Sequence, residues 1–142
     1  MRQLFFILTI LTLTTLAVQG QVKKCDGTIL LSTSEKIGKL SGKEIADFLL
    51  TFGQVCRDNA EYSEWSNELL FKLLDKQTEL TVKTIEKEEK RLEMATILND
   101  LSEPIGDASD IKILIAKIER VDINDRLKRE IIRNLKTADE KY

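Results

Sequence analysis

Two cysteines carry the clearest chemistry in this chain of 142 residues, which contains no histidine. Cys25 and Cys56 could form a disulfide, bind a metal ion or supply a thiol nucleophile. Two sulfur ligands do not complete a tetrahedral zinc site, and no imidazole is present to add to them. An even pair of cysteines in an exported protein usually bonds. We therefore predict an intramolecular disulfide between Cys25 and Cys56, which leaves no free thiol for catalysis.

The other residues that could do chemistry form no recognisable catalytic pattern. Without histidine, the serines lack the general base that serine hydrolases commonly use. The carboxylates are numerous, but their positions give no reason to pair any two of them as general acid and base. Gly38 and Gly42 lack the preceding strand that a phosphate-binding loop requires. We therefore expect no enzymatic activity, no metal site and no cofactor.

Residues 1–20 have the layout of a secretory signal peptide. Arg2 supplies the basic start, an apolar run extends from Leu4 to Val18, and Val18 and Gly20 are small residues where a signal peptidase cuts. The apolar run is shorter than the roughly 20 residues that a membrane-spanning helix needs. We therefore predict a signal peptide over residues 1–20, a single helical domain without a membrane span over residues 21–142, and secretion to the extracellular space.

The charge balance argues against a nucleic-acid partner. The chain has 22 basic and 24 acidic residues, for a formal net charge of −2, and the two signs are mixed along the sequence. A nucleic-acid-binding protein needs a clustered basic face that displaces counterions from the phosphates. We expect no nucleic acid among the partners of this protein.

The clearest local signal is the start of a helix at Ser41. Ser41 and Glu44 form an S-x-x-E capping box, and Leu40 with Ile45 occupies the positions of a hydrophobic staple. Apolar residues then recur at helical spacing and place Cys56 on the buried stripe. We expect one helix from Ser41 to about Cys56, whose stripe consists of Ile45, Phe48, Leu49, Phe52, Val55 and Cys56.

The segment from Tyr62 to Leu101 contains no proline and no glycine and carries one broad apolar face. A continuous rod of this length would extend about 60 Å, which exceeds the length of its partners. We therefore expect a bend or a short break, either between Asp75 and Thr78 or between Glu86 and Arg91.

The strongest break downstream is Pro104 with Gly106. After it, Asp107, Ser109 and Asp110 are candidate caps for one helix, and a second apolar stripe precedes the C-terminus. The predicted fold is therefore all-α: a small disulfide-tied bundle of about three to five helices, one of them long.

Two groups of residues are candidate binding surfaces. The charged run from Glu86 to Arg91 cannot lie in a dry core, so it is either a solvated waist on a helix or a docking patch for a protein. Five aromatic side chains could pack in the core or line a cavity for an apolar ligand. The docking patch comprises Glu86, Lys87, Glu88, Glu89, Lys90 and Arg91, and the aromatic set comprises Phe48, Phe52, Tyr62, Trp65 and Phe71.

Function follows by elimination, because no catalytic pattern is present. The chain is similar in size and composition to small secreted effectors such as salivary or parasite-exported proteins. We expect a secreted protein-binding module, an inhibitor or effector that acts on another extracellular protein. The alternative is a carrier that holds a lipid or another small hydrophobic molecule between its helices.

Overall fold

The structure is a computed structural model that describes Cys25, residues 27–106 and residues 110–141. The predicted signal peptide lies outside the described residues. The described part is helical throughout and contains no strand. Its helices are α1 (Gly27–Lys36), α2 (Gly42–Leu49), α3 (Gln54–Arg57), α4 (Ala60–Lys76), α5 (Thr78–Glu88), α6 (Met94–Ser102), α7 (Ile111–Glu119) and α8 (Asp125–Lys141).

This architecture confirms an all-α fold with a disulfide, but the predicted number of helices is wrong. The expectation was three to five helices, whereas the described residues form seven helices besides α3, which is a single turn of four residues. The sequence contains several breaks that carry neither proline nor glycine, and those breaks account for the additional helices. The prediction also included one helix longer than the others. In the described part no one helix is the longest, because α4 and α8 are both 17 residues long.

The helix that starts at Ser41 ends earlier than its apolar pattern indicates. Ser41 forms the predicted capping box, but α2 stops at Leu49 instead of continuing to Cys56. The Thr51 hydroxyl donates to the Phe48 carbonyl at 2.7 Å, and a turn follows before α3. The apolar spacing continues past the end of α2 because the residues before and after this turn face the same core. The spacing therefore predicted too long a helix.

The segment from 62 to 101 is broken at both of the expected places. Gln77 ends α4 and begins α5, with backbone angles of −136° and 45° that are not helical. A second turn between Glu88 and Met94 separates α5 from α6. Folding back twice lets α6 return to α4, which a straight rod could not do.

The last two helices begin at polar caps. Asp110 is one of the predicted caps, and its carboxylate accepts from the backbone N–H groups of Lys112 and Ile113 at 3.0 and 3.2 Å. Asn124 occupies the corresponding position before α8, where its side-chain oxygen accepts from the Arg126 N–H at 2.9 Å. Each cap satisfies backbone donors that the first helical turn leaves unpaired.

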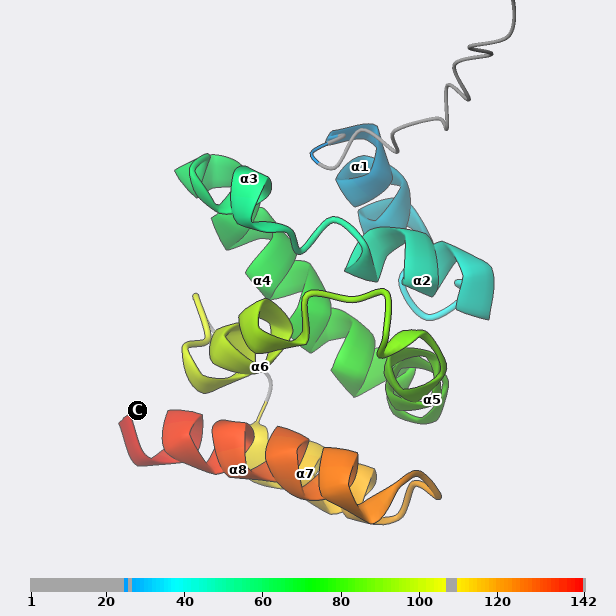
Figure 1. Cartoon of the computed structure of the whole chain (residues 1–142), viewed down its shortest axis with the longest axis vertical. Coiled ribbons are helices and arrows are strands. Elements are labelled where there is room, and N and C mark those ends of the chain that lie inside the picture. Colours follow the sequence, from blue (N-terminus) through cyan, green and yellow to red (C-terminus); the bar gives the residue numbers. More distant parts are fainter. Residues whose placement is uncertain (1–24, 26, 107–109, 142) are drawn as a thin grey trace, which may run out of the picture.

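The core surrounds α4, which crosses the molecule diagonally between α1–α2 on one side and α7–α8 on the other (Figure 1). α4 contacts α1, α3, α5 and α6, while α8 packs against α6 and α7. The centre of the core consists of fully buried leucines on α4, namely Leu69, Leu70, Leu73 and Leu74. No helix in the described part is long and apolar enough to cross a membrane.

Candidate functional site

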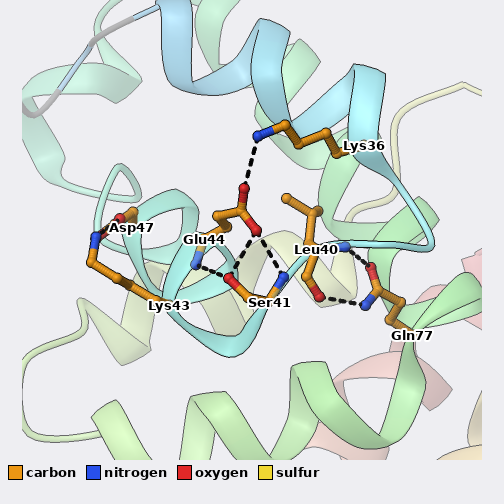
Figure 2. A network of polar contacts seen from close by, with 7 residues as sticks. All are labelled: Lys36, Leu40, Ser41, Lys43, Glu44, Asp47 and Gln77. Atoms are coloured by element: carbon orange, nitrogen blue, oxygen red, sulfur yellow. Dashed lines mark hydrogen bonds and ion pairs between the residues drawn. The ribbon is translucent and has the colours of Figure 1, made fainter.

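The candidate site is a groove between α2 and α5, which lie side by side. Its first wall, α2, is held by polar contacts at its N-terminus (Figure 2). The Ser41 N–H and hydroxyl both donate to one Glu44 carboxylate oxygen, at 2.9 and 2.8 Å, and the Glu44 N–H donates back to the Ser41 oxygen at 3.3 Å. Lys36 donates to the other Glu44 oxygen at 2.9 Å, which links α1 to α2.

These contacts also change the acidity of Glu44. They lower the pKa of Glu44 to about 2, chiefly through the Ser41 backbone N–H and then through Lys36 and the Ser41 hydroxyl. Hydrogen bonds and a cation that stabilise the carboxylate favour its charged form. Glu44 therefore stays ionised over the whole neutral range and keeps the start of α2 in place.

Gln77 joins α2 to α5, the second wall of the groove. Its side-chain oxygen accepts from the backbone N–H groups of Gly38 and Leu40, both at 3.1 Å, and its side-chain nitrogen donates to the Leu40 carbonyl at 2.8 Å. Figure 2 shows the two contacts with Leu40 beside the capping box of α2. Gly38 has a φ of 87°, which a residue with a side chain rarely adopts. One glutamine at the α4–α5 break thus fixes the loop that leads into α2.

Small residues on α2 form part of the floor of the groove. Gly42 and Ala46 face α5, and a Cβ atom at Gly42 would lie 3.6 Å from the Thr84 hydroxyl and 3.7 Å from a Leu80 methyl group. Leu80 is 39% exposed although it is a large apolar residue. With Leu50 these residues line a groove of about 430 Å³ whose floor is largely apolar.

The rim of the groove is charged and carries more cations than carboxylates. Most of the cations are paired: Lys43 with Asp47 at 2.8 Å, Lys83 with Glu79 at 2.6 Å, and Arg91 with Glu88 at 2.6 Å. The hydrogen bonds that Lys43 donates to Asp47 and Lys83 donates to Glu79 raise the pKa of these two lysines. The charged residues that line the groove are Lys43, Lys83, Lys87 and Arg91 against Asp47 and Glu88, and with Glu79, the partner of Lys83, the excess is one positive charge.

The predicted docking patch divides between two surroundings. Lys87, Glu88 and Arg91 line the groove. Glu86 instead accepts from the Asn124 N–H at 2.6 Å, and Glu89 forms an ion pair with Arg126. Half of the run therefore borders an open surface, while Glu86 and Glu89 tie the end of α5 to the start of α8. Lys90 is exposed.

The five aromatic residues of the predicted apolar lining lie in or against one hydrophobic core. Phe48, Phe52, Tyr62 and Phe71 are buried, and Trp65 is half-buried against them. The Phe48 and Phe52 rings meet edge to face with centroids 5.3 Å apart. The cavity beside Phe52 and Tyr62 has a volume of about 10 Å³. That volume holds about one water molecule.

The predicted disulfide is present between Cys25 and Cys56, with Cα atoms 5.3 Å apart. Cys56 belongs to α3 and is buried in the core, whereas Cys25 is exposed. The bridge therefore ties the segment that precedes α1 to the short helix before α4.

A buried polar cluster near the disulfide has no counterpart in the sequence predictions. Arg57 donates to the carboxylate of Asp100 at 3.1 Å, and the Asp100 side chain is only 8% exposed. The Asn67 amide donates to the carbonyls of Asp100 and Glu103, both at 3.1 Å, and accepts from the Ile105 N–H at 3.0 Å. Polar residues on an amphipathic helix read as exposed in the sequence, so no local signal could have found this cluster.

Burial dominates the acidity of Asp100. Desolvation raises the pKa of Asp100 to about 6, although the Arg57 cation opposes this and the nearby Glu103 carboxylate adds to it. The cluster holds α3, α4 and the end of α6 together. It adjoins the small cavity beside Phe52 and Tyr62, which Arg57 and Asp100 also line.

The described residues contain no group of three or more histidine, cysteine, aspartate and glutamate side chains that could hold a metal ion. The arrangement at the groove is suited to binding, because an apolar floor and fixed charges can recognise a complementary surface. Comparisons of the chain with family models, with curated proteins and with solved structures give no match.

Proposed function

We propose that this protein is a secreted module that binds another extracellular protein, as an inhibitor or effector, through the groove between α2 and α5. The observation that carries the proposal is the combination of an apolar floor with a cationic rim. Leu80 is 39% exposed there and lies beside Ala46 and Leu50 in the lining, so an apolar group of a partner could contact all three.

The shape and charge of the groove favour a particular occupant, an acidic amphipathic helix of the partner. A volume of about 430 Å³ accommodates a few anchoring side chains rather than a whole domain. Leucine-like anchors of such a helix would contact Ala46, Leu50 and Leu80, in the way that helices commonly bind in grooves. Carboxylates beside the anchors would meet the excess positive charge of the rim.

The rigidity of the two walls supports the same proposal. The capping box and the Gln77 contacts hold the groove open before any partner arrives. A preformed site loses less conformational entropy on binding than a mobile one. The disulfide suits an oxidising extracellular environment, where such bonds persist.

A designed peptide tests the proposal without knowledge of the natural partner. The probe is a labelled helical peptide with leucines on one face and glutamates on the other, and fluorescence anisotropy reports its binding. We expect Lys83→Glu with Lys87→Glu to weaken binding about tenfold or more, because both lysines line the rim. The matched control is Lys39→Glu with Lys112→Glu, which changes net charge equally at two exposed positions that do not line the groove.

Equal weakening by the two double variants would mean that the peptide responds only to overall charge, and the groove would lose its proposed role. Equal binding of a peptide that carries lysines in place of glutamates would also contradict the acidic occupant. Circular dichroism of each variant establishes that its helices are retained.

A further inference from the structure

α8 carries a second charged surface, on the side of the helix that faces away from the core. Arg126, Arg129, Arg133 and Lys136 recur at steps of three and four residues, which places them within about 80° of one another around the helix axis. We call these four residues the α8 stripe. α8 lies at the edge of the molecule (Figure 1). All four residues of the stripe are exposed.

The opposite side of α8 fixes the orientation of the stripe. The buried residues Leu127, Ile131, Leu135 and Ala138 pack toward α6 and α7. On a helical projection their direction is about 180° from that of the stripe. The helix therefore cannot rotate its cations away from solvent without exposing its apolar face.

The α8 stripe differs from the groove rim in how its charges are balanced. Three of the four rim cations form ion pairs on their own helix or turn. Among the four residues of the α8 stripe, Arg126 alone is paired with described residues, namely Glu89 and Glu130. Arg129, Arg133 and Lys136 form no ion pair with any described residue, although Glu119, Glu130 and Glu140 line the same shallow hollow. Three neighbouring cations are thus available for an external anion.

We infer that the α8 stripe binds a sulfated polysaccharide. The inference rests on the proposed secretion for the compartment in which such a polymer is met, but not on the α2–α5 groove. Arginine forks bind sulfate-like oxyanions in a bidentate way, and Lys136 adds a point charge. Successive cations lie about 4.5 to 6 Å apart along the axis, which suits a chain with spaced anionic groups.

Two features of the surface favour this ligand over other polyanions. Duplex DNA binding requires a broad clustered basic face, whereas this surface is a single row of four cations flanked by Glu119 and Glu140. A membrane surface would require apolar residues to insert, but the apolar face of α8 is already buried and Ile132 between the cations is half-buried.

The test uses the disulfide-bonded chain and heparin as the probe, with affinity measured by calorimetry at several salt concentrations. We expect Arg129→Gln, Arg133→Gln and Lys136→Gln together to weaken heparin binding at least about tenfold and to reduce its salt dependence. The matched control is Lys39→Gln, Lys90→Gln and Lys112→Gln, which removes the same charge from three exposed lysines that form no ion pair with described residues. The control should retain nearly all of the affinity.

The inference is overturned if the control loses as much affinity as the stripe variant, or if the wild-type chain does not bind heparin. A further variant with Lys43→Gln, Lys83→Gln and Lys87→Gln should bind heparin normally, and a large loss there would move the site to the groove. Desulfated heparin should bind weakly. Binding of double-stranded DNA or of phosphatidylserine vesicles as tight as that of heparin would contradict the assignment to a sulfated polysaccharide.

Discussion

Two polar clusters join the helices of this protein, and they use carboxylates in opposite ways. The cluster at Ser41, Glu44 and Gln77 is largely exposed and links α1, α2 and α5. The cluster at Arg57, Asn67 and Asp100 is largely buried and links α3, α4 and α6. The first lowers the pKa of its carboxyl group to about 2, while the second raises that of its carboxyl group to about 6.

The two clusters contribute to stability in different ways. Hydrogen bonds from Ser41 stabilise a carboxylate that water still reaches, so little desolvation opposes them. Asp100 loses its hydration and has a single cation as partner. The cost of desolvating its carboxylate therefore nearly cancels the attraction of the ion pair. The buried cluster is the more sensitive to loss of one member, because the remaining charge would be left unpaired in the interior. The predictions below separate the two.

The largest effect is expected at the disulfide, which adjoins the buried cluster. Replacing Cys25 and Cys56 with serine should lower the free energy of unfolding by about 3 to 4 kcal/mol, because the bridge closes a loop of 31 residues in the unfolded chain. Urea unfolding measures the change. Reductant should destabilise the wild-type chain and leave the double variant unaffected, and a loss under about 1 kcal/mol would contradict the account.

The next effect concerns the ion pair of the buried cluster. Arg57→Met should lower the free energy of unfolding by about 2 to 3 kcal/mol at pH 8, less than for a fully buried pair because Arg57 is 32% exposed. The loss should shrink below about pH 6, where Asp100 takes up a proton. A loss of equal size at pH 5 and pH 8 would show that packing of the arginine stem dominates.

The pKa of Asp100 also predicts a pH dependence of the wild-type chain. Its folded-state pKa of about 6 exceeds the ordinary value of 3.8, so the folded chain binds a proton more readily than the unfolded chain. This group therefore makes folding more favourable as the pH falls from about 7 to about 4. Asp100→Asn removes that component, and the difference between the two stability profiles is the measurement. A constant difference would contradict the raised pKa.

A smaller effect is expected at the exposed clamp. Gln77→Ala removes three partly exposed hydrogen bonds to Gly38 and Leu40 and should cost about 1 to 2 kcal/mol. Hydrogen exchange should report faster opening of α2 and α5, with α8 unchanged. Opening of all helices together would mean that the glutamine supports the whole core rather than the groove.

The smallest effect is expected at the cap. Ser41→Ala should cost about 1 kcal/mol, since the first turn of α2 loses its side-chain acceptor. The variant should also lose part of the stabilisation that Glu44 provides above its ordinary pKa of 4.5 and that disappears as the pH falls toward about 2. Acid titration of Glu44 by NMR checks this, and an unchanged pKa would contradict the role of Ser41.

Sequence reasoning succeeded where the signal is local. The capping box at Ser41, the cap at Asp110 and the disulfide each depend on a few residue types at fixed spacing, and all three are present. It failed at the lengths of helices. α2 ends at Leu49 although its apolar spacing continues to Cys56, because the chain turns through Thr51 and Gly53 while residues on both sides of the turn still face the core.

The candidate site was predicted only in part, for a similar reason. The charged run from Glu86 to Arg91 was predicted as a docking patch, and three of its residues line the groove at the end of α5. The other wall of the groove lies on α2. The pairing of α2 with α5 depends on the break at Gln77, which falls within the predicted range from Asp75 to Thr78, but the sequence did not predict that α5 would turn toward α2. Glu86 and Glu89 looked like surface charges in the sequence, and each instead contacts the segment around the start of α8.

Mapping the contact by NMR shows whether the α2–α5 groove binds an acidic amphipathic helix. The isotope-labelled chain is titrated with the leucine and glutamate peptide, and the amide shifts are followed residue by residue. The account predicts shifts concentrated at Ala46, Leu50, Leu80 and Thr84, which line the groove. Shifts concentrated on α8, or spread evenly over exposed lysines, would contradict it.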